Sequence, residues 1–108
     1  MSAPEPRIVA PDRVAPDEVF LVRTLITHQM ETGLRQDAAG ISIPRKIINR
    51  FVCVYDGAIV FEADFYEAMA ANPYLEFHVR ATRSGLLELT WHEDGGAVFT
   101  ATKDVTVA

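Results

Sequence analysis

The sequence predicts an all-β fold, an immunoglobulin-like β-sandwich of about seven antiparallel strands, formed by a single domain over residues 1–108. Three observations favour this fold. Several segments alternate apolar and polar residues with a period of two, which is typical of strands with one buried face. Turn-forming residues recur about every 8–12 residues, as they do in β-sandwiches. Pro4, Pro6, Pro11 and Pro16 exclude a helix from the N-terminal part and allow only short edge strands there.

The first half of the chain predicts four strands. Residues 7–10 form a short edge strand, whereas residues 18–28 and 46–56 are long, rich in β-branched residues and apolar on both faces, as central strands are. An Asp-Gly pair then predicts a hairpin turn into a strand at residues 58–65. Residues 66–73 are the only segment suited to a helical turn, which its final proline would end.

The second half shows the cleanest alternation, in residues 74–82 and 86–94, and ends with a strand at 97–108. The residues predicted to face the core are Leu75, Phe77, Val79, Ala81, Leu87, Leu89 and Trp91. The residues predicted to face solvent are Glu76, His78, Arg80, Glu88, Thr90 and His92. Because the chain has one cysteine, the Cys–Trp–Cys pattern of antibody domains is absent, and a small open barrel is the alternative fold.

The composition argues against several classes of protein. A formal net charge of −5 disfavours nucleic-acid binding and a polybasic membrane anchor. No apolar run approaches the ~20 residues of a membrane span. The N-terminus lacks the basic start and apolar stretch of a secretory signal, which by itself indicates the cytoplasm. Hydrophobic residues make up 49% of the chain, which reflects either a well-filled core or an apolar surface that another chain covers. In the second case, an isolated chain is expected to self-associate.

Four basic residues, Arg35, Arg45, Lys46 and Arg50, lie close together in the sequence, with Asp37 among them. Such a group can bind an acidic partner or a small anion, or it can form a solvated face. The sequence leaves both interpretations open.

Candidate catalytic and metal-binding residues are few. Cys53 lies in the middle of an apolar strand, where burial raises the pKa of a thiol, so we expect an inert core residue. His28, His78, His92 and Cys53 are the candidate ligands of a single metal ion, although no two of them share a local ligand spacing. His78 and His92 are expected on the outward faces of neighbouring strands. Glu31 with His28 is the only local pair suited to acid–base catalysis.

The sequence has no motif for a catalytic serine and none for phosphate or dinucleotide binding. The residues by themselves therefore favour a binding or assembly module, and they indicate no activity beyond that.

Three segments, THQMETGLRQD, IPRKIINRF and ANPYLEFHVRA, in this order and at these separations, closely resemble the SoxZ family. The resemblance extends from RIVAP to LTWHEDGGAVFTA and departs from the family pattern at Gln29, where a proline is expected. It implies an immunoglobulin-like sandwich that binds SoxY, the subunit whose C-terminal Gly-Gly-Cys-Gly-Gly tail carries the sulfur intermediates of bacterial thiosulfate oxidation. It implies no catalytic residue and no cofactor on this chain. Cys53 is far from the C-terminus and is not the carrier thiol.

The resemblance also implies a location and a contact surface. Proteins of this family work in the periplasm and are exported to it together with signal-bearing SoxY. The SoxYZ complex makes transient contacts there with the other Sox enzymes. SoxY is expected to cover an apolar face of one sheet in a stable interface. The loop 28–37 and residues 72–75 are expected to shape the surface that the other Sox enzymes meet, and the basic residues are expected near the sulfur-carrying tail of SoxY. The candidate interface residues are His28, Met30, Glu31, Thr32, Gly33, Arg35, Arg45, Arg50, Asn72, Pro73 and Tyr74.

Within the loop, Met30 suits an apolar contact with a partner, and Glu31 and Thr32 are expected to brace a turn in which Gly33 has a positive φ. The basic residues would favour an anionic sulfur cargo by their charge. Two other functions remain open. One is a mononuclear-metal redox protein similar to superoxide reductases, and the other is a free-standing adhesion or chaperone domain that pairs edge strands with many partners.

Overall fold

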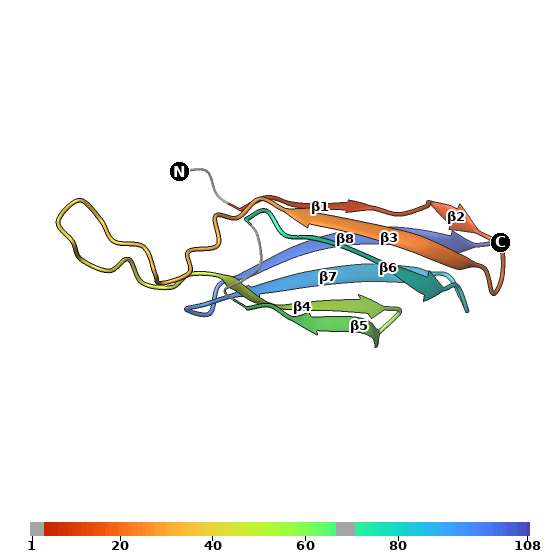
Figure 1. Cartoon of the computed structure of the whole chain (residues 1–108). Coiled ribbons are helices and arrows are strands. Elements are labelled where there is room, and N and C mark those ends of the chain that lie inside the picture. Colours follow the sequence, from red (N-terminus) through yellow and green to blue (C-terminus); the bar gives the residue numbers. More distant parts are fainter. Residues whose placement is uncertain (1–3, 67–70) are drawn as a thin grey trace.

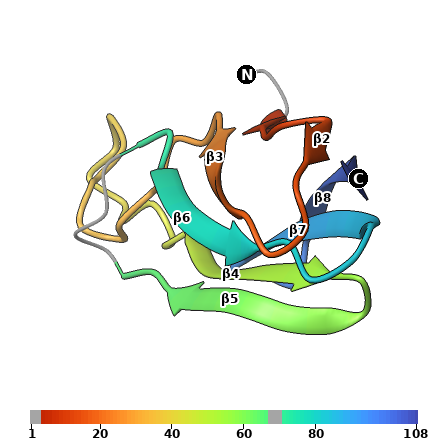
Figure 2. The same ribbon diagram turned by 90° about the vertical axis from the view of Figure 1, so that its right-hand side faces the viewer.

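The computed structural model describes residues 4–66 and 71–108, and it consists of two β-sheets packed face to face (Figure 1). The smaller sheet has the strand order β1-β3-β6, with β1 at Pro6–Val9, β3 at Val19–Ile26 and β6 at Tyr74–Arg80. The larger sheet has the order β2-β8-β7-β4-β5, with β2 at Arg13–Val14, β8 at Val98–Val107, β7 at Gly85–Glu93, β4 at Ile48–Tyr55 and β5 at Ala58–Asp64. A view turned toward the end of the sandwich shows the two layers (Figure 2).

The prediction of an all-β sandwich is confirmed. The described chain has eight strands, against an expectation of about seven, and its two sheets do not close into the barrel that was the alternative. The ends of the predicted strands agree with the observed ends to within about two residues, which is the usual uncertainty of such limits. The immunoglobulin-like topology stays a prediction.

One strand, β2, was not predicted. It has only two residues, lies between Pro11 and Pro16, and pairs parallel to β8, with Arg13 opposite Thr106. The other strand pairs of the described chain are antiparallel, as expected. Because β1 and β2 belong to different sheets, the chain crosses from one sheet to the other and joins them along one edge.

The hairpin turn predicted at Asp56-Gly57 is present between β4 and β5. Asp56 and Gly57 have φ values of 49° and 82°, and two consecutive positive values are typical of the type I′ turn that suits a β-hairpin. The helical turn expected at 66–73 falls mainly on residues 67–70, which lie outside the described residues, and the two residues after them form a bend. No helix in the described part of the chain is long and apolar enough to cross a membrane.

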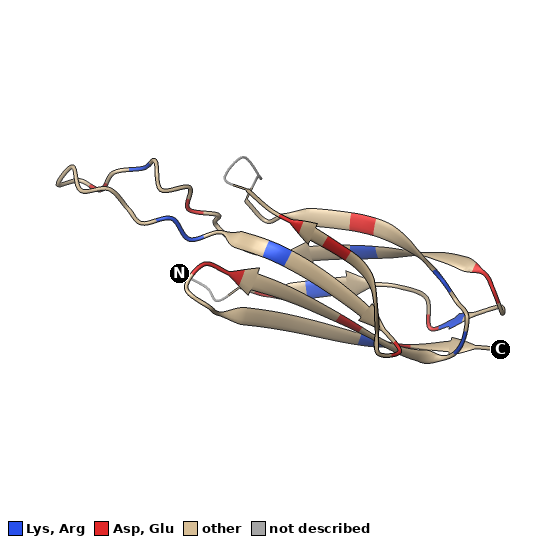
Figure 3. Cartoon of the chain, turned by 90° about the horizontal axis from the view of Figure 1, so that it is seen from below, with Lys and Arg blue, Asp and Glu red and all other residues tan. Residues whose placement is uncertain are grey.

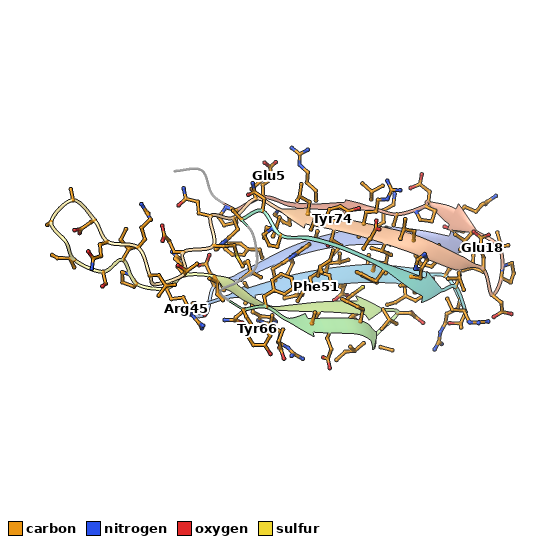
Figure 4. The ribbon with its side chains drawn as sticks, in the orientation of Figure 1. Glu5, Glu18, Arg45, Phe51, Tyr66 and Tyr74 are labelled. Atoms are coloured by element: carbon orange, nitrogen blue, oxygen red, sulfur yellow. The ribbon has the colours of Figure 1, made fainter. Side chains whose placement is uncertain are left out.

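The core is formed by alternate residues of the two facing sheets. Phe51 of β4 lies between the sheets, with its ring centroid 5.1 Å from that of Trp91 and 5.9 Å from that of Phe77 (Figure 4). Phe77 also stacks on Phe61 of β5 at 4.4 Å, so the two edge strands β5 and β6 contact each other through their aromatic rings. The predicted core positions are confirmed, because six of them are buried and Leu75 is partly buried.

Between β3 and β4 the chain leaves the sandwich and forms a long projection (Figure 1). We call residues 31–46 the arm, because a backbone bridge between Glu31 and Lys46 marks its base. The molecule measures 59 × 22 × 20 Å. Its Cα radius of gyration of 16.2 Å exceeds the about 13 Å typical of a compact chain of this length. The arm therefore extends beyond the volume that the core fills.

Cys53 points into the core from the middle of β4 and has no exposed surface. Burial raises the pKa of its thiol to about 12. The thiol is therefore protonated at neutral pH, and Cys53 behaves as a small apolar core residue rather than as a nucleophile.

We predict that the native chain does not react with a water-soluble aromatic disulfide reagent at about pH 8, because the Cys53 thiol is both inaccessible and protonated. The same thiol should react fully after the protein is unfolded in concentrated denaturant. The absorbance of the released aromatic thiol, with and without denaturant, measures both reactions. Rapid reaction of the native chain would contradict the buried position of Cys53.

Candidate functional site

Two ionisable residues extend the core-facing rows of the two sheets. In β3 the buried positions run through every second residue up to Ile26, and His28 is the next inward position beyond the strand. In β7 the buried row runs through Leu89 and Trp91 to Glu93. The two rows belong to different sheets, and their last members meet between the sheets at the end from which the arm leaves. His28 Nε2 lies 2.6 Å from Glu93 Oε2, and each side chain is only 6% exposed.

The hydrogen bonds of His28 determine where its proton lies. The backbone N–H of Met30 donates to Nδ1 at 2.9 Å, so Nδ1 is an acceptor and carries no proton. The ring proton is therefore on Nε2, and it is donated to the carboxylate of Glu93. The pair consists of a neutral imidazole and a buried carboxylate. The nearest cation is Lys46, whose Nζ lies 3.7 Å from the other carboxylate oxygen, Oε1.

The backbone around His28 is fixed by Asn72 and Met30. The His28 N–H donates to Asn72 Oδ1 at 2.8 Å, and the Asn72 N–H donates to the His28 carbonyl at 2.8 Å. Met30 has φ of 56°, and its side chain, only 4% exposed, enters the core, where Sδ accepts a hydrogen bond from the Ile48 N–H at 3.3 Å. The expectation that Met30 contacts a partner is therefore wrong, because this side chain fills the end of the core.

The returning end of the arm is fixed by Asp94, which follows β7. The Asp94 carboxylate accepts hydrogen bonds from Arg45 Nε at 2.8 Å and from Asn49 Nδ2 at 3.0 Å. It also accepts the Ile47 N–H at 3.2 Å, and the Asp94 N–H donates to the Ile47 carbonyl at 2.9 Å. Burial opposes the ionisation of Asp94, but the hydrogen bonds from Asn49, Arg45 and the Ile47 N–H outweigh it and lower the pKa of this carboxyl. Arg45 lies where the arm joins the sandwich (Figure 4).

The arm itself is a hairpin held by backbone hydrogen bonds. Its two sides are joined by the bridges Glu31–Lys46 and Gln36–Ser42. At the tip, Asp37 Oδ1 accepts the N–H groups of Ala39 at 2.9 Å and Ile41 at 3.0 Å, as in an Asx turn.

The brace predicted near the start of the arm is confirmed. The Leu34 N–H donates to Thr32 Oγ1 at 3.2 Å, and Gly33 has a φ of 87°. A Cβ at Gly33 would lie 3.3 Å from the Cβ of Arg45, so glycine suits both the backbone conformation and the close approach of the returning chain.

The arm has exposed apolar side chains and no core of its own. Leu34 is 87% exposed and Ile41 is 65% exposed. An isolated two-stranded hairpin is at best marginally stable in water. The arm therefore depends on its anchored base for its position, and it presents apolar surface that a binding partner can cover.

The basic residues do not form one surface. Arg35 pairs with Glu31, Arg45 with Asp94, and Lys46 with Glu93 at 3.7 Å. Arg50 pairs across the sheet with Glu62 and Asp64 of β5 at 2.5 and 3.0 Å. Lys and Arg residues are spread along the arm and the sandwich with acidic residues between them (Figure 3). Of the two interpretations left open by the sequence, this arrangement favours the solvated face, because each basic residue has a carboxylate partner of its own.

The candidate metal ligands lie apart. His78 belongs to β6 and His92 to β7, which are in different sheets, so the expectation that they occupy neighbouring strands is wrong. His28 is bonded to Glu93, and Cys53 is enclosed in the core. Within residues 4–66 and 71–108, no three His, Cys, Asp or Glu side chains are placed to hold a metal ion. The expected pair of His28 with Glu31 is also absent from the described contacts, since Glu31 pairs with Arg35.

Of the remaining predicted contact residues, Tyr74 is 51% exposed and donates its hydroxyl to Glu76, Asn72 is exposed, and Pro73 is buried. The sequence analysis missed Glu93 and Asp94 altogether. A signal for Glu93 was present, because it continues the inward row of β7 after Trp91. No local pattern indicated Asp94, whose partners are about half the chain away.

We predict that His28→Ala lowers the free energy of unfolding by about 1.5–3 kcal/mol, because it removes a hydrogen bond to a charged group and leaves the Glu93 carboxylate without its donor. Adding Glu93→Gln should recover part of this loss, because no charge is then left without a partner. Urea denaturation of the wild type, both single variants and the double variant measures the effect. A double variant no more stable than His28→Ala would contradict a charged carboxylate at this position.

Solved structures of low sequence identity share the fold. A superoxide reductase (neelaredoxin) from Ignicoccus hospitalis matches with a TM-score of 0.68 and 22% identity, over 95% of this chain and 80% of that chain. A putative superoxide reductase from Thermotoga maritima matches with a TM-score of 0.71 and 18% identity, over 95% of this chain and 85% of that chain. The sulfur carrier protein SoxY from Chlorobium limicola f. thiosulfatophilum matches with a TM-score of 0.67 and 15% identity, over 95% of this chain and 78% of that chain. At these identities the likeness establishes the fold alone.

One protein family matches nearly the whole sequence of this chain. None of the curated protein sequences matches this chain. The family described as sulphur oxidation protein SoxZ matches residues 8–104. This range includes the arm, the His28–Glu93 and Asp94 contacts at its base, and nearly every strand. The three segments that resembled this family in the sequence all lie inside the match. The chain therefore belongs to the SoxZ family of sulphur oxidation proteins.

Proposed function

We propose that this chain is the non-catalytic subunit of the SoxYZ sulfur carrier complex. It binds SoxY, whose C-terminal cysteine carries the sulfur intermediates, and so helps to present them to the other Sox enzymes. Membership of the SoxZ family supports this role. The structural similarity to a SoxY protein supports a complex in which the two subunits share one architecture.

The arm is the observation that favours a binding role most strongly. It extends beyond the core, has a fixed base and exposes the side chains of Leu34 and Ile41. Burying one large aliphatic side chain completely contributes about 1.5–3 kcal/mol. A few side chains at the centre of an interface supply most of its binding energy, so two buried aliphatic side chains can contribute substantially to the stability of a complex. We therefore assign the main SoxY-binding surface to the arm.

The hydrogen bonds and the burial of His28, Cys53 and Glu31 favour a non-catalytic subunit. Both ring nitrogens of His28 are engaged, so the ring cannot exchange a proton with a substrate without losing a structural hydrogen bond. The Cys53 thiol has a pKa of about 12 and no exposed surface. Glu31 is held by Arg35, and this hydrogen bond lowers the pKa of Glu31.

The second candidate function is a mononuclear-metal redox protein. It is favoured by the fold shared with superoxide reductases and disfavoured by the separation of the candidate ligands His28, His78, His92 and Cys53. Metal analysis of protein purified without a histidine tag distinguishes the two functions. Iron, copper or zinc retained in a one-to-one ratio would support the metal protein and count against the binding subunit.

We also propose that the chain works in the periplasm and is exported with SoxY. A single thiol enclosed in the core forms no disulfide and is compatible with an oxidising compartment. The test is fractionation of cells that produce the chain with or without signal-bearing SoxY. The chain should reach the periplasmic fraction only in the presence of SoxY, and a chain that stays in the cytoplasm in both cases would contradict the proposal.

We predict that Leu34→Asp together with Ile41→Asp weakens SoxY binding by about 100-fold or more, because two charges replace apolar contacts that the complex desolvates. The fold should be unaffected, since both side chains are exposed in the free chain. Co-expression with SoxY, size-exclusion chromatography with mass detection, and calorimetric titration measure the effect.

Val9→Asp is the matched control. Val9 is 64% exposed, similar to Ile41 at 65%, but it lies in β1 on the sandwich. This variant should form a one-to-one complex with SoxY as the wild type does. If the control weakens binding as much as the arm variant, the arm is not the main binding surface.

A further inference from the structure

A cavity lies beside the base of the arm, and the buried His28–Glu93 pair lines it. Its volume is about 380 Å³, far more than a single water needs. The walls include Lys46 and Glu31 from the base of the arm, and Asn72 from the chain before β6. The cavity is therefore large enough to accept a side chain from another protein.

The Glu93 carboxylate is undercompensated in this cavity. Oε2 accepts the His28 proton, but His28 is neutral and brings no charge. Among the described residues, Oε1 has only the ammonium of Lys46 at 3.7 Å, which is longer than a hydrogen bond, and that side chain is 65% exposed to water. No described side-chain oxygen is both buried and unsatisfied, so the unused acceptor capacity of Oε1 faces the cavity, where a donor can reach it.

The charge of the cavity favours a cationic occupant. Among the described residues of the walls, Glu93 and Glu31 contribute two negative charges and Lys46 contributes one positive charge. Glu31 is shared with Arg35, whereas the cation that pairs with Glu93 among the described residues is Lys46, at 3.7 Å and with a largely exposed side chain. A planar guanidinium donates several hydrogen bonds in a fixed geometry and is less strongly hydrated than an ammonium, so it is the cation best suited to a partly buried carboxylate.

We propose that this cavity receives an arginine side chain of SoxY, whose guanidinium hydrogen-bonds to Glu93. This proposal rests on the binding role proposed above and adds a second, electrostatic contact at the base of the arm. The apolar side chains of the arm and the arginine in the cavity then bind on either side of the Glu31–Lys46 bridge. Arginine residues in desolvated pockets are common centres of binding energy in protein interfaces.

The first experiment uses the free chain and a small probe. N-acetyl-arginine amide is titrated at low ionic strength, and NMR follows the backbone amides and the His28 ring. The expected dissociation constant is on the order of 1 mM for a single side chain. Glu93→Gln should weaken binding by about tenfold, because it removes the charge and keeps an oxygen that can accept the His28 proton.

Lys46→Met provides a test of opposite sign. Removing the competing ammonium makes the cavity more negative, so binding of the probe should strengthen by about threefold or more.

Glu62→Gln is the control for a general loss of negative charge, because Glu62 lies in β5 beside Arg50. Damage to the fold would weaken binding in both cavity variants. Unchanged binding in Glu93→Gln, or weaker binding in Lys46→Met, would overturn the proposal.

The second experiment uses the complex with SoxY. Glu93→Gln should weaken SoxY binding by about tenfold, with a smaller salt dependence than the wild type, while Glu62→Gln leaves it unchanged. If Glu93→Gln binds SoxY normally while the Asp substitutions in the arm abolish binding, the cavity proposal fails and the proposed function stands. If neither the arm nor the cavity variants change SoxY binding, both proposals fail.

Discussion

The hydrogen bond between His28 and Glu93 joins the two sheets at the end of the sandwich where the arm begins. The Met30 N–H donates to Nδ1 of His28 and so leaves the ring proton on Nε2. One backbone group therefore determines the tautomer of His28 and makes the ring the donor to Glu93. The same turn directs Met30 into the core and brings the chain to Asn72. The start of the arm therefore depends on these side-chain contacts together with the backbone bridge between Glu31 and Lys46.

The returning end of the arm depends on Asp94, the residue next to Glu93. Two adjacent carboxylates at the end of β7, on its last residue Glu93 and on Asp94, therefore hold the two ends of the arm. Glu93 acts through His28, and Asp94 acts through Arg45, Ile47 and Asn49. Such an arrangement orients a hairpin that has no core of its own. Its cost is a buried carboxylate, which a hydrophobic pair of similar shape would avoid.

The strands could be predicted from the sequence because a half-buried strand has its own period-two pattern, as residues 74–82 show. Turn chemistry predicted the β4–β5 hairpin and the positive φ of Gly33 for the same local reason. The site was less predictable, because its contacts join residues far apart, such as His28 and Glu93, which are 65 positions apart. Sequence proximity grouped the basic residues, but the carboxylate partners of Arg45, Lys46 and Arg50 are set by strand register or by the folded-back chain. Arg50 illustrates this, because its partners are fixed by the pairing of β4 with β5.

We propose that the arm is an anchored hairpin whose free surface SoxY covers. Hydrogen–deuterium exchange of the chain alone and in complex with SoxY tests it most directly. In the free chain, we expect slow exchange at Met30 and Ile47, which the anchors hold, and faster exchange at the tip of the arm. On binding SoxY, the amides between Leu34 and Ile43 should become protected, whereas those of β7 and β8 should change little. Protection that appears only on the sandwich, with the arm still exchanging as in the free chain, would contradict the claim.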